Sequence, residues 1–432
     1  MAIIFSYPLI SSLANDDRLL ISDMDAGSGN PTKSVTVSQL ATFFGVSTGG
    51  PFVPYVDGAG KRITRTEETN KNTSLGFEAL AGLTTGTGNV AMGFNAGKVL
   101  DVGFENVILG NGAGVTATGA DYNVFIGTDA GKSATTCQNA IAIGYKALEL
   151  ATGNSTGFQI AIGRQALQNA STTSAFGNIA VGNEAGQNVT TTGWQNIFIG
   201  ADSGKAITEG QRNVVLGFDA LKADTDSNEN VAIGADALLV QTAGPTASIN
   251  SPRNIALGYQ AGRGLTTGTN TILIGFDAGN NTAMTGTNNV LIGDDASPTA
   301  AGANNEFTLG NSSTAVLRCQ QTTITALSDQ RDKTSIEDLP YGLDFVDSLQ
   351  PKKFVWDNRA EFDGDGNEYF SANKGNKDIG FIAQELQTVD DEWLNLVYDS
   401  NPNRLEASYG KLIPVLVKAI KELKARVEAL EA

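Results

Sequence analysis

The sequence predicts a mainly β protein in which a β-solenoid shaft of repeated units is followed by a separate C-terminal domain. Two observations carry this prediction. A short pattern with an invariant glycine recurs along the first three quarters of the chain, and the composition changes at Ser328. The first 327 residues hold 41 charged side chains and 44 of the 50 glycines, whereas the last 105 residues hold 34 charged side chains. A glycine-rich, weakly charged body is therefore joined to a charged part of ordinary composition.

The repeated unit has the form Asn-h-x-h-Gly-x-x-Ala-(Gly/Leu), where h is apolar. We call these slots the ladder position, two flanking positions around a middle position, and the corner glycine. The unit occurs fourteen times, most often every 17 residues, and Asn fills ten of the ladder positions. A fixed period of this kind is typical of repeat architectures. The corner glycines are Gly76, Gly93, Gly110, Gly127, Gly144, Gly163, Gly182, Gly200, Gly217, Gly234, Gly258, Gly275, Gly293 and Gly310.

Each unit is predicted to be a short strand that ends in a corner. The flanking positions, such as Val124 and Ile126, are two residues apart and face the same side, which we expect to be the core. The corner glycine suits a positive φ or a tightly packed turn, Asn suits turn hydrogen bonding, and the Ala fits a narrow interior. Successive coils would then stack into a solenoid.

On this prediction the middle position faces outward. A row of large apolar side chains on a solenoid is unfavourable in water, so we expect other copies of the chain to cover it, in a three-fold arrangement. Scattered surface hydrophobic residues are the alternative interpretation. The six large apolar middle residues are Ile108, Phe125, Phe198, Val215, Leu273 and Leu291.

Composition also excludes several kinds of chemistry. The chain has no histidine, so Ser-His-Asp and Cys-His nucleophile systems and histidine zinc sites are ruled out. Cys137 and Cys319 lie far apart and are expected to be buried thiols. A net charge of −17 argues against nucleic acid and anionic membrane surfaces as partners. The sequence contains neither a signal peptide nor a long apolar span, so no membrane insertion is expected.

The repeats resemble those of two families. Segments such as GNVAMGFNAG and NNVLIGDDAS, within residues 72–310, are similar to repeats of trimeric autotransporter adhesin heads and of phage tail-fibre shafts. Residues 1–50 resemble the small N-terminal modules that attach phage fibres to the particle. The resemblance implies an attachment module at 1–50, a linker at 51–71, a shaft at 72–310 and a distal tip at 311–327.

Residues 328–432 resemble the endosialidase-type intramolecular chaperone, a self-cleaving serine peptidase domain at the ends of phage tail spikes and fibres. The resemblance lies in SDQRDKTSIEDLPYGLDFVDSLQPKKFVWD, DIGFIAQEL and ASYGKLIPVLVKAIKELKARVEALEA. It implies a small α+β domain with Ser328 as nucleophile and Lys333 as general base. The Leu327–Ser328 bond would be cut once, after a trimer has folded, and the chaperone would leave.

A Ser-Lys pair is one of the few nucleophile systems open to a chain without histidine, provided that burial favours the uncharged lysine. Ser328 and Lys333 would lie on different faces of a helix, so direct contact requires a turn or loop. A solvated charged turn with Ser as a helix cap is the alternative. Asp329 and Gln384 are possible supporting groups of the site.

Other segments of the C-terminal part suggest structure rather than chemistry. Asp363, Asp365 and Asn367 alternate as in a calcium loop, but the glutamate at the twelfth position is missing, so no metal and no cofactor is expected. The tail predicts a coiled-coil helix, with packing on its own domain as the alternative. Pro414 should lie in the first turn of this helix. The seam consists of Ile413, Leu416, Ile420, Leu423, Val427 and Leu430.

Together these features predict a homotrimeric phage tail fibre, made in the host cytoplasm and carried on the virion. Its N-terminus would bind a tail or baseplate protein. A host cell-surface glycan or protein would bind either the tip at 311–327 or the lateral insertion at 239–249, and the receptor-binding residues are unknown. A bacterial trimeric surface adhesin is the first alternative, although it would ordinarily need a signal peptide and an anchor. A polysaccharide-degrading tailspike would need a groove with paired carboxylates.

Overall fold

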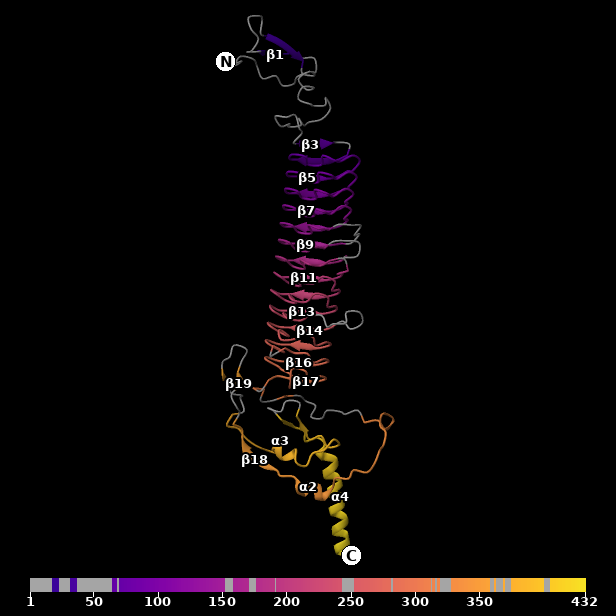
Figure 1. Ribbon diagram of the computed structural model, residues 1–432, viewed down its shortest axis with the longest axis vertical. Helices are drawn as coiled ribbons and strands as arrows, with labels where there is room; N and C mark the ends of the chain where they lie inside the picture. The colour runs from indigo at the N-terminus through magenta and orange to yellow at the C-terminus, as the bar shows by residue number, and fades with distance from the viewer. Residues whose placement is uncertain are drawn as a thin grey trace. The chain divides into compact units, whose positions relative to one another are not determined.

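Figure 1 shows the chain as a computed structural model. It forms two compact units, Met1–Asp219 and Ala220–Ala432. The structure describes residues 18–22, 32–36, 64–67, 70–151, 158–170, 176–190, 192–242, 252–280, 283–311, 313–314, 317–318, 328–357, 361–362, 368–369, 374–399 and 405–432.

The first unit contains β1 (Arg18–Ser22) paired antiparallel with β2 (Thr32–Thr36), and β3 (Thr64–Glu67) paired antiparallel with β4 (Asn72–Leu75). Since β3 belongs to the expected linker at 51–71, the end of that segment joins the sheet. From β4 onward each strand pairs in parallel with the next. These strands are β5 (Val90–Met92), β6 (Val107–Leu109), β7 (Val124–Ile126), β8 (Ile141–Ile143), β9 (Ile160–Ile162), β10 (Ile179–Val181), β11 (Ile197–Ile199) and β12 (Val214–Leu216).

The second unit begins with five further coils, whose strands also pair in parallel with the next. They are β13 (Val231–Ile233), β14 (Ile255–Leu257), β15 (Ile272–Ile274), β16 (Val290–Ile292) and β17 (Phe307–Leu309). The prediction of a mainly β chain with a parallel repeat solenoid is therefore confirmed, and in each unit the coils follow one another in chain order (Figure 1).

The C-terminal part, residues 328–432, holds short antiparallel strand pairs and helices, ending in the long helix expected from the tail. β18 pairs with β21, β19 with β20, and β22 with β23. The elements are η1 (Gln330–Asp332), α2 (Leu343–Ser348), β18 (Lys352–Val355), β19 (Glu361–Phe362), β20 (Glu368–Tyr369), β21 (Lys377–Gly380), α3 (Ala383–Leu386), β22 (Val397–Tyr398), β23 (Glu406–Ala407) and α4 (Leu412–Glu431).

The prediction of which side of each strand faces the core is wrong. The middle position points into the coil, and the two flanking positions point out. Phe125 and Phe198 are fully buried, whereas Val90 is 39% exposed and Met92 is 49% exposed. The reason lies in the ladder position, whose Asn is buried and shares a side with the middle residue two positions later. The other middle residues expected to face outward are fully buried as well: Ile108, Val215, Leu273 and Leu291.

In several coils the interior is filled by complementary sizes at two positions. In the coil of Phe125 the residue six positions later is Gly131, whose added Cβ would lie 2.6 Å from the Phe125 ring. In the coil of Ala142 the equivalent residue is the buried Leu148. Each coil therefore buries a core of its own, so the outward row used to predict association does not exist at these residues.

The ladder asparagines form a buried chain of hydrogen bonds between coils. The backbone N of Asn106 and its Nδ2 donate to Oδ1 of Asn89 at 3.0 and 2.9 Å, and Nδ2 also donates to the carbonyl of Ala120 at 2.6 Å. Asn123 repeats the arrangement on Asn106. The amide thus links neighbouring coils rather than serving one turn, and its burial is tolerated because its polar atoms are paired.

The corner glycine is required by conformation and by space. Gly127 has φ +131°, and a Cβ at this position would lie 2.6 Å from the carbonyl oxygen of Gly144 in the next coil. Side chains do not adopt this φ without strain, and the obstructing atom belongs to the backbone. Stacking of the coils therefore depends on the missing side chain.

Replacing Gly127 with Ala is expected to lower the free energy of unfolding by roughly 2–4 kcal/mol, from backbone strain and overpacking. Gly119→Ala is the matched control, because the nearest atom to its added Cβ is 3.8 Å away. Denaturant unfolding followed by circular dichroism measures both. Equal midpoints for the two variants would contradict the close approach at the corner.

Candidate functional site

The segment that starts the C-terminal part folds into a tight turn. Asp329 caps η1 by accepting a hydrogen bond from the backbone N of Arg331 at 2.8 Å, and Lys333 follows in an extended conformation. This reversal brings Nζ of Lys333 to 2.6 Å from Oγ of Ser328, to which it donates a hydrogen bond. The two residues expected to form the nucleophile and base pair are therefore in direct contact.

Their surroundings differ from what the sequence reasoning required. A general base must be able to accept a proton, and an uncharged lysine is favoured where water is excluded. Ser328 and Lys333 are both exposed in the single chain. The described residues thus supply the contact between Oγ and Nζ without the burial. Leu327, on the other side of the expected cleavage point, lies outside the described residues.

Asp329 has a local partner. Its carboxylate forms an ion pair with the guanidinium of Arg331 at 2.6 Å, and the hydrogen bonds from the Arg331 side chain and backbone hold the pKa of Asp329 below its ordinary value. The Asp329 carboxylate binds Arg331 within the turn, so it acts on the Ser-Lys pair through the shape of the turn. It positions the segment that carries Lys333.

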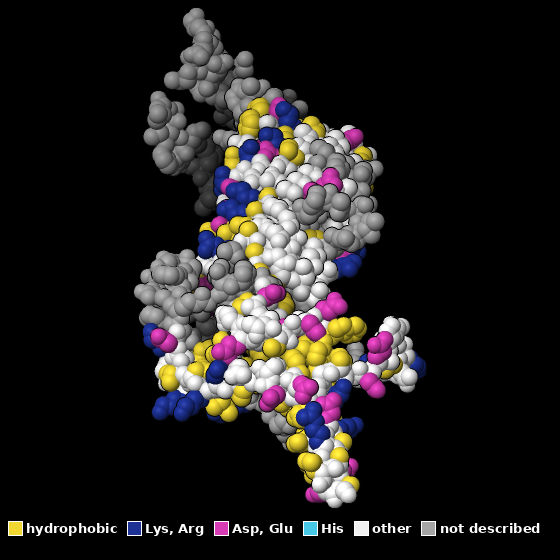
Figure 2. Space-filling model, turned by 60° about the horizontal axis from the view of Figure 1, so that its bottom comes forward, with side chains coloured by type: hydrophobic (Ala, Val, Ile, Leu, Met, Phe, Trp, Pro, Cys, Tyr) yellow, Lys and Arg dark blue, Asp and Glu magenta, His cyan; other side chains and the backbone are white. Residues whose placement is uncertain are grey.

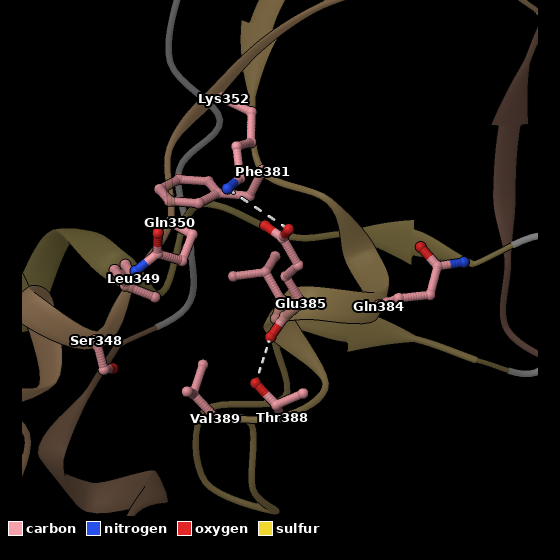
Figure 3. A pocket seen from close by; sticks show the side chains of 10 residues that line it. Ser348, Leu349, Gln350, Lys352, Phe381, Gln384, Glu385, Thr388 and Val389 are labelled. Atoms are coloured by element: carbon pink, nitrogen blue, oxygen red, sulfur yellow. Dashed lines mark hydrogen bonds and ion pairs between the residues drawn. The ribbon is translucent and has the colours of Figure 1, made fainter.

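Gln384 lies elsewhere in the C-terminal part. It is an exposed residue of α3, and within the described residues no hydrogen bond joins it to Ser328 or Lys333. Figure 3 shows its side chain directed away from the other side chains around a cavity of about 420 Å³. The structure therefore does not unite Gln384 with the Ser-Lys pair.

The described side chains that line the cavity beside α3 are not arranged as a catalytic centre. Lys352 and Glu385 form an ion pair across it at 3.6 Å, and Thr388 donates to the backbone carbonyl of Glu385 at 2.7 Å (Figure 3). The hydroxyl of Ser348 donates to the carbonyl of Phe345 at 2.6 Å. These four polar side chains are used within the fold, and among the described residues that line the cavity no nucleophile lies beside a base.

The helix α4 packs on its own domain with one face and leaves the predicted seam uncovered. Leu412, Val415 and Ala419 are its buried residues. Figure 2 shows hydrophobic side chains on the surface of its projecting end. The alternative, packing on its own domain, is therefore observed, and the coiled coil stays a prediction because the packing uses a different face from the heptad-like one. Every seam residue is exposed: Ile413, Leu416, Ile420, Leu423, Val427 and Leu430.

Sequence reasoning missed an exposed apolar surface of the repeats. The two flanking positions of successive strands form two apolar columns, which we call the sheet face. Ile162 is 36% exposed, Ile199 is 38% exposed and Leu216 is 41% exposed. A signal was present: the flanking positions are apolar in nearly every unit, whereas the middle position varies between Ala and Phe as a packed interior does.

The comparisons with known proteins bear on the C-terminal part. Residues 328–395 match the family model described as chaperone of endosialidase, which agrees with the resemblance seen in the sequence over less than half of the chain. No curated protein and no solved structure matches the chain. Within the described residues, none of the helices combines the length and apolar character needed to span a bilayer.

A metal site was not expected, and the described residues contain no cluster of three or more Cys, Asp and Glu side chains that could hold an ion. Asp363, Asp365 and Asn367, the calcium-like alternation, lie outside the described residues, as does Cys319. Cys137 is buried in a coil.

The turn predicts a specific titration. Because the Arg331 hydrogen bonds favour the charged carboxylate, the pKa of Asp329 should lie below its ordinary value. Arg331→Ala removes the side-chain bonds and keeps the backbone one, so it should raise the pKa part of the way back. The charged carboxylate of Asp329 accepts the hydrogen bonds that shape the turn. The stability that these bonds give the turn is therefore fully present above the ordinary pKa of aspartate, and it is lost as the pH falls through the lowered pKa of Asp329. NMR of aspartate carboxyl carbons measures the midpoint. Lys333→Ala is the control, and an equal shift in both variants would contradict the assignment.

Proposed function

We propose that the chain is a homotrimeric phage tail fibre whose C-terminal part is an assembly chaperone released by a single self-cleavage at Leu327–Ser328. The observation that carries the proposal is the sheet face, supported by the chaperone match at residues 328–395 and the contact between Ser328 and Lys333. Residues 1–50 would attach to a tail or baseplate protein. The shaft and tip would reach a glycan or protein on the host cell, and the mature protein would be carried on the virion.

The sheet face favours association because it is apolar, contiguous and built from ordered strands. Large continuous apolar patches are uncommon on soluble monomers and usually mark interaction sites. Covering a half-exposed Val, Ile or Leu contributes about 1 kcal/mol, and most coils offer two such residues. Copies of the same chain carry identical columns at identical spacing, so they match one another coil by coil.

The exposed seam of α4 supports three-fold association from the other end of the chain. Apolar residues spaced by three and four along a helix bury one another in a coiled coil. Gathering the chains at their C-terminal parts would precede the slow pairing of distant strands. The family matched at 328–395 and the repeat resemblance both favour a trimer over other oligomers.

The cleavage would start at the Ser328 hydroxyl, which belongs to the residue whose nitrogen forms the scissile bond. Lys333 Nζ takes the hydroxyl proton as Oγ attacks the carbonyl carbon of Leu327 and closes a small ring. The carbon–nitrogen bond breaks, the nitrogen receives the proton, and the Leu327 acyl group is left as an ester on Oγ. Water then hydrolyses the ester to a Leu327 carboxylate and a free Ser328.

Assembly would control this reaction through the surroundings of the lysine. A lysine acts as a general base where water is excluded, and Lys333 is exposed to water in the single chain. Close packing of other copies against the turn would remove that water. Cleavage would thus follow assembly, which fits the order expected for a chaperone that leaves a finished shaft.

Cleavage is tested by expressing the whole chain with Ser328→Ala and, separately, with Lys333→Met. Wild type should release a fragment of 105 residues, and both variants should stay intact. The Ala variant lacks the nucleophile, and the Met variant keeps the length of the side chain without its amine. Intact-protein mass spectrometry reads the result.

Lys353→Met is the matched control, since Lys353 is another exposed lysine of the C-terminal part. It should cleave as wild type does. Cleavage in the Ser328→Ala variant, or its loss in the control, would remove the Ser-Lys assignment while leaving the fibre proposal standing.

Association is tested on the sheet face with the double variant Ile162→Glu and Ile199→Glu. Charges placed in a buried apolar contact are strongly unfavourable, so the trimer should dissociate or fail to form. Light scattering gives the molar mass, and circular dichroism checks that the strands remain.

Val102→Glu is the control for this experiment. Val102 is an exposed valine of the shaft outside the strands, and its variant should remain trimeric. A double variant as trimeric as the control would mean that the sheet face is not the contact.

A further inference from the structure

The last coil of the shaft ends the asparagine ladder with a different residue. In the preceding coils the ladder Asn offers Oδ1 to the backbone N of the next ladder residue, as Asn254 does to Thr271 at 2.9 Å. Asn289 continues the pattern by accepting from the backbone N of Glu306 at 2.9 Å. Glu306 itself precedes β17, after which the described residues contain no further coil. Its carboxylate is the side-chain acceptor at the last ladder position of the described residues.

That carboxylate is held from two directions. Oε2 accepts a hydrogen bond from the backbone N of Thr299 at 2.9 Å, within the turn that leads to the last coil. Oε1 accepts the Thr299 hydroxyl and also the hydroxyl of Tyr398 at 2.6 Å. A carboxylate can only accept, so it suits a position whose neighbours are donors. Tyr398 supplies a donor where the ladder would otherwise receive the N–H groups of another coil.

Tyr398 is positioned by the core of the C-terminal part. It lies on β22 beside Val397, which is buried in the same cluster as Leu396 and Val415. The backbone N of Leu396 and that of Val397 both donate to the carboxylate of Asp390 at 2.8 and 2.9 Å. The Tyr398 hydroxyl therefore reaches Glu306 only when this core is folded and the last coil has closed.

We propose that Tyr398 caps the ladder: the C-terminal part recognises the closed last coil by taking the place of the next one. The open edge of a parallel sheet is otherwise a template for unwanted pairing, and a hydrogen bond to a charged acceptor is stronger than a neutral one. The meaning of the contact rests on the proposed function, because release after cleavage would require the cap to be given up. The cap would hold the last coil closed until then.

The cap is tested in the uncleaved Ser328→Ala chain by hydrogen exchange of residues 299–310. Tyr398→Phe removes only the hydroxyl, and exchange in this segment should become roughly threefold faster or more. Glu306→Gln keeps an uncharged acceptor, so its effect should be smaller. Exchange of β6 to β8 should not change in either variant, because these strands lie in the other unit.

Tyr409→Phe is the matched control. Among the described residues its hydroxyl is hydrogen-bonded to the backbone of Phe381 in the C-terminal part, so its loss should leave residues 299–310 unchanged. Identical exchange in Tyr398→Phe and the parent would overturn the cap, and so would equal acceleration by Tyr409→Phe. Intact mass of the same samples reports cleavage separately, so a failure of the Ser-Lys assignment is distinguishable.

Discussion

The close approach of one corner glycine to the next is the contact on which the rest of the structure depends. At Gly127 and Gly234 an added Cβ would lie 2.6 and 2.1 Å from the following corner carbonyl. Because the backbones stack at this distance, each residue of a unit lies on its counterpart in the next coil. Identical positions then form continuous columns: asparagines and middle residues inside, flanking residues outside. The regular repeat length in the sequence follows from this stacking.

The sequence predicted the repeated strands and their corners, because each depends on local pattern. It did not predict which way the strands face. Alternation fixes only that Val124 and Ile126 share a side, and the core side has to be chosen by another criterion. Asparagine at positions such as Asn123 was expected to serve turn hydrogen bonding, whereas its buried amide bonds to neighbouring coils, which a single unit does not show.

The candidate site also has a part that depends on local sequence and a part that depends on distant packing. Ser328 and Lys333 are five residues apart, so a local turn can unite them, and both the resemblance and the need for a turn could be stated from sequence. Gln384 is distant in the chain, and its place is decided by the packing of α3. Exposure of Lys333 could not be predicted either, since it depends on what lies over the turn. In the proposed function this exposure connects the chemistry to assembly.

The most direct test of the proposed assembly is a cryo-EM structure of the Ser328→Ala protein, read at the contacts between chains. We predict three copies whose flanking valines, isoleucines and leucines pack against one another, while each Phe125 and Phe198 stays inside its own coil. Copies joined through another surface, with the flanking columns facing solvent, would contradict this arrangement.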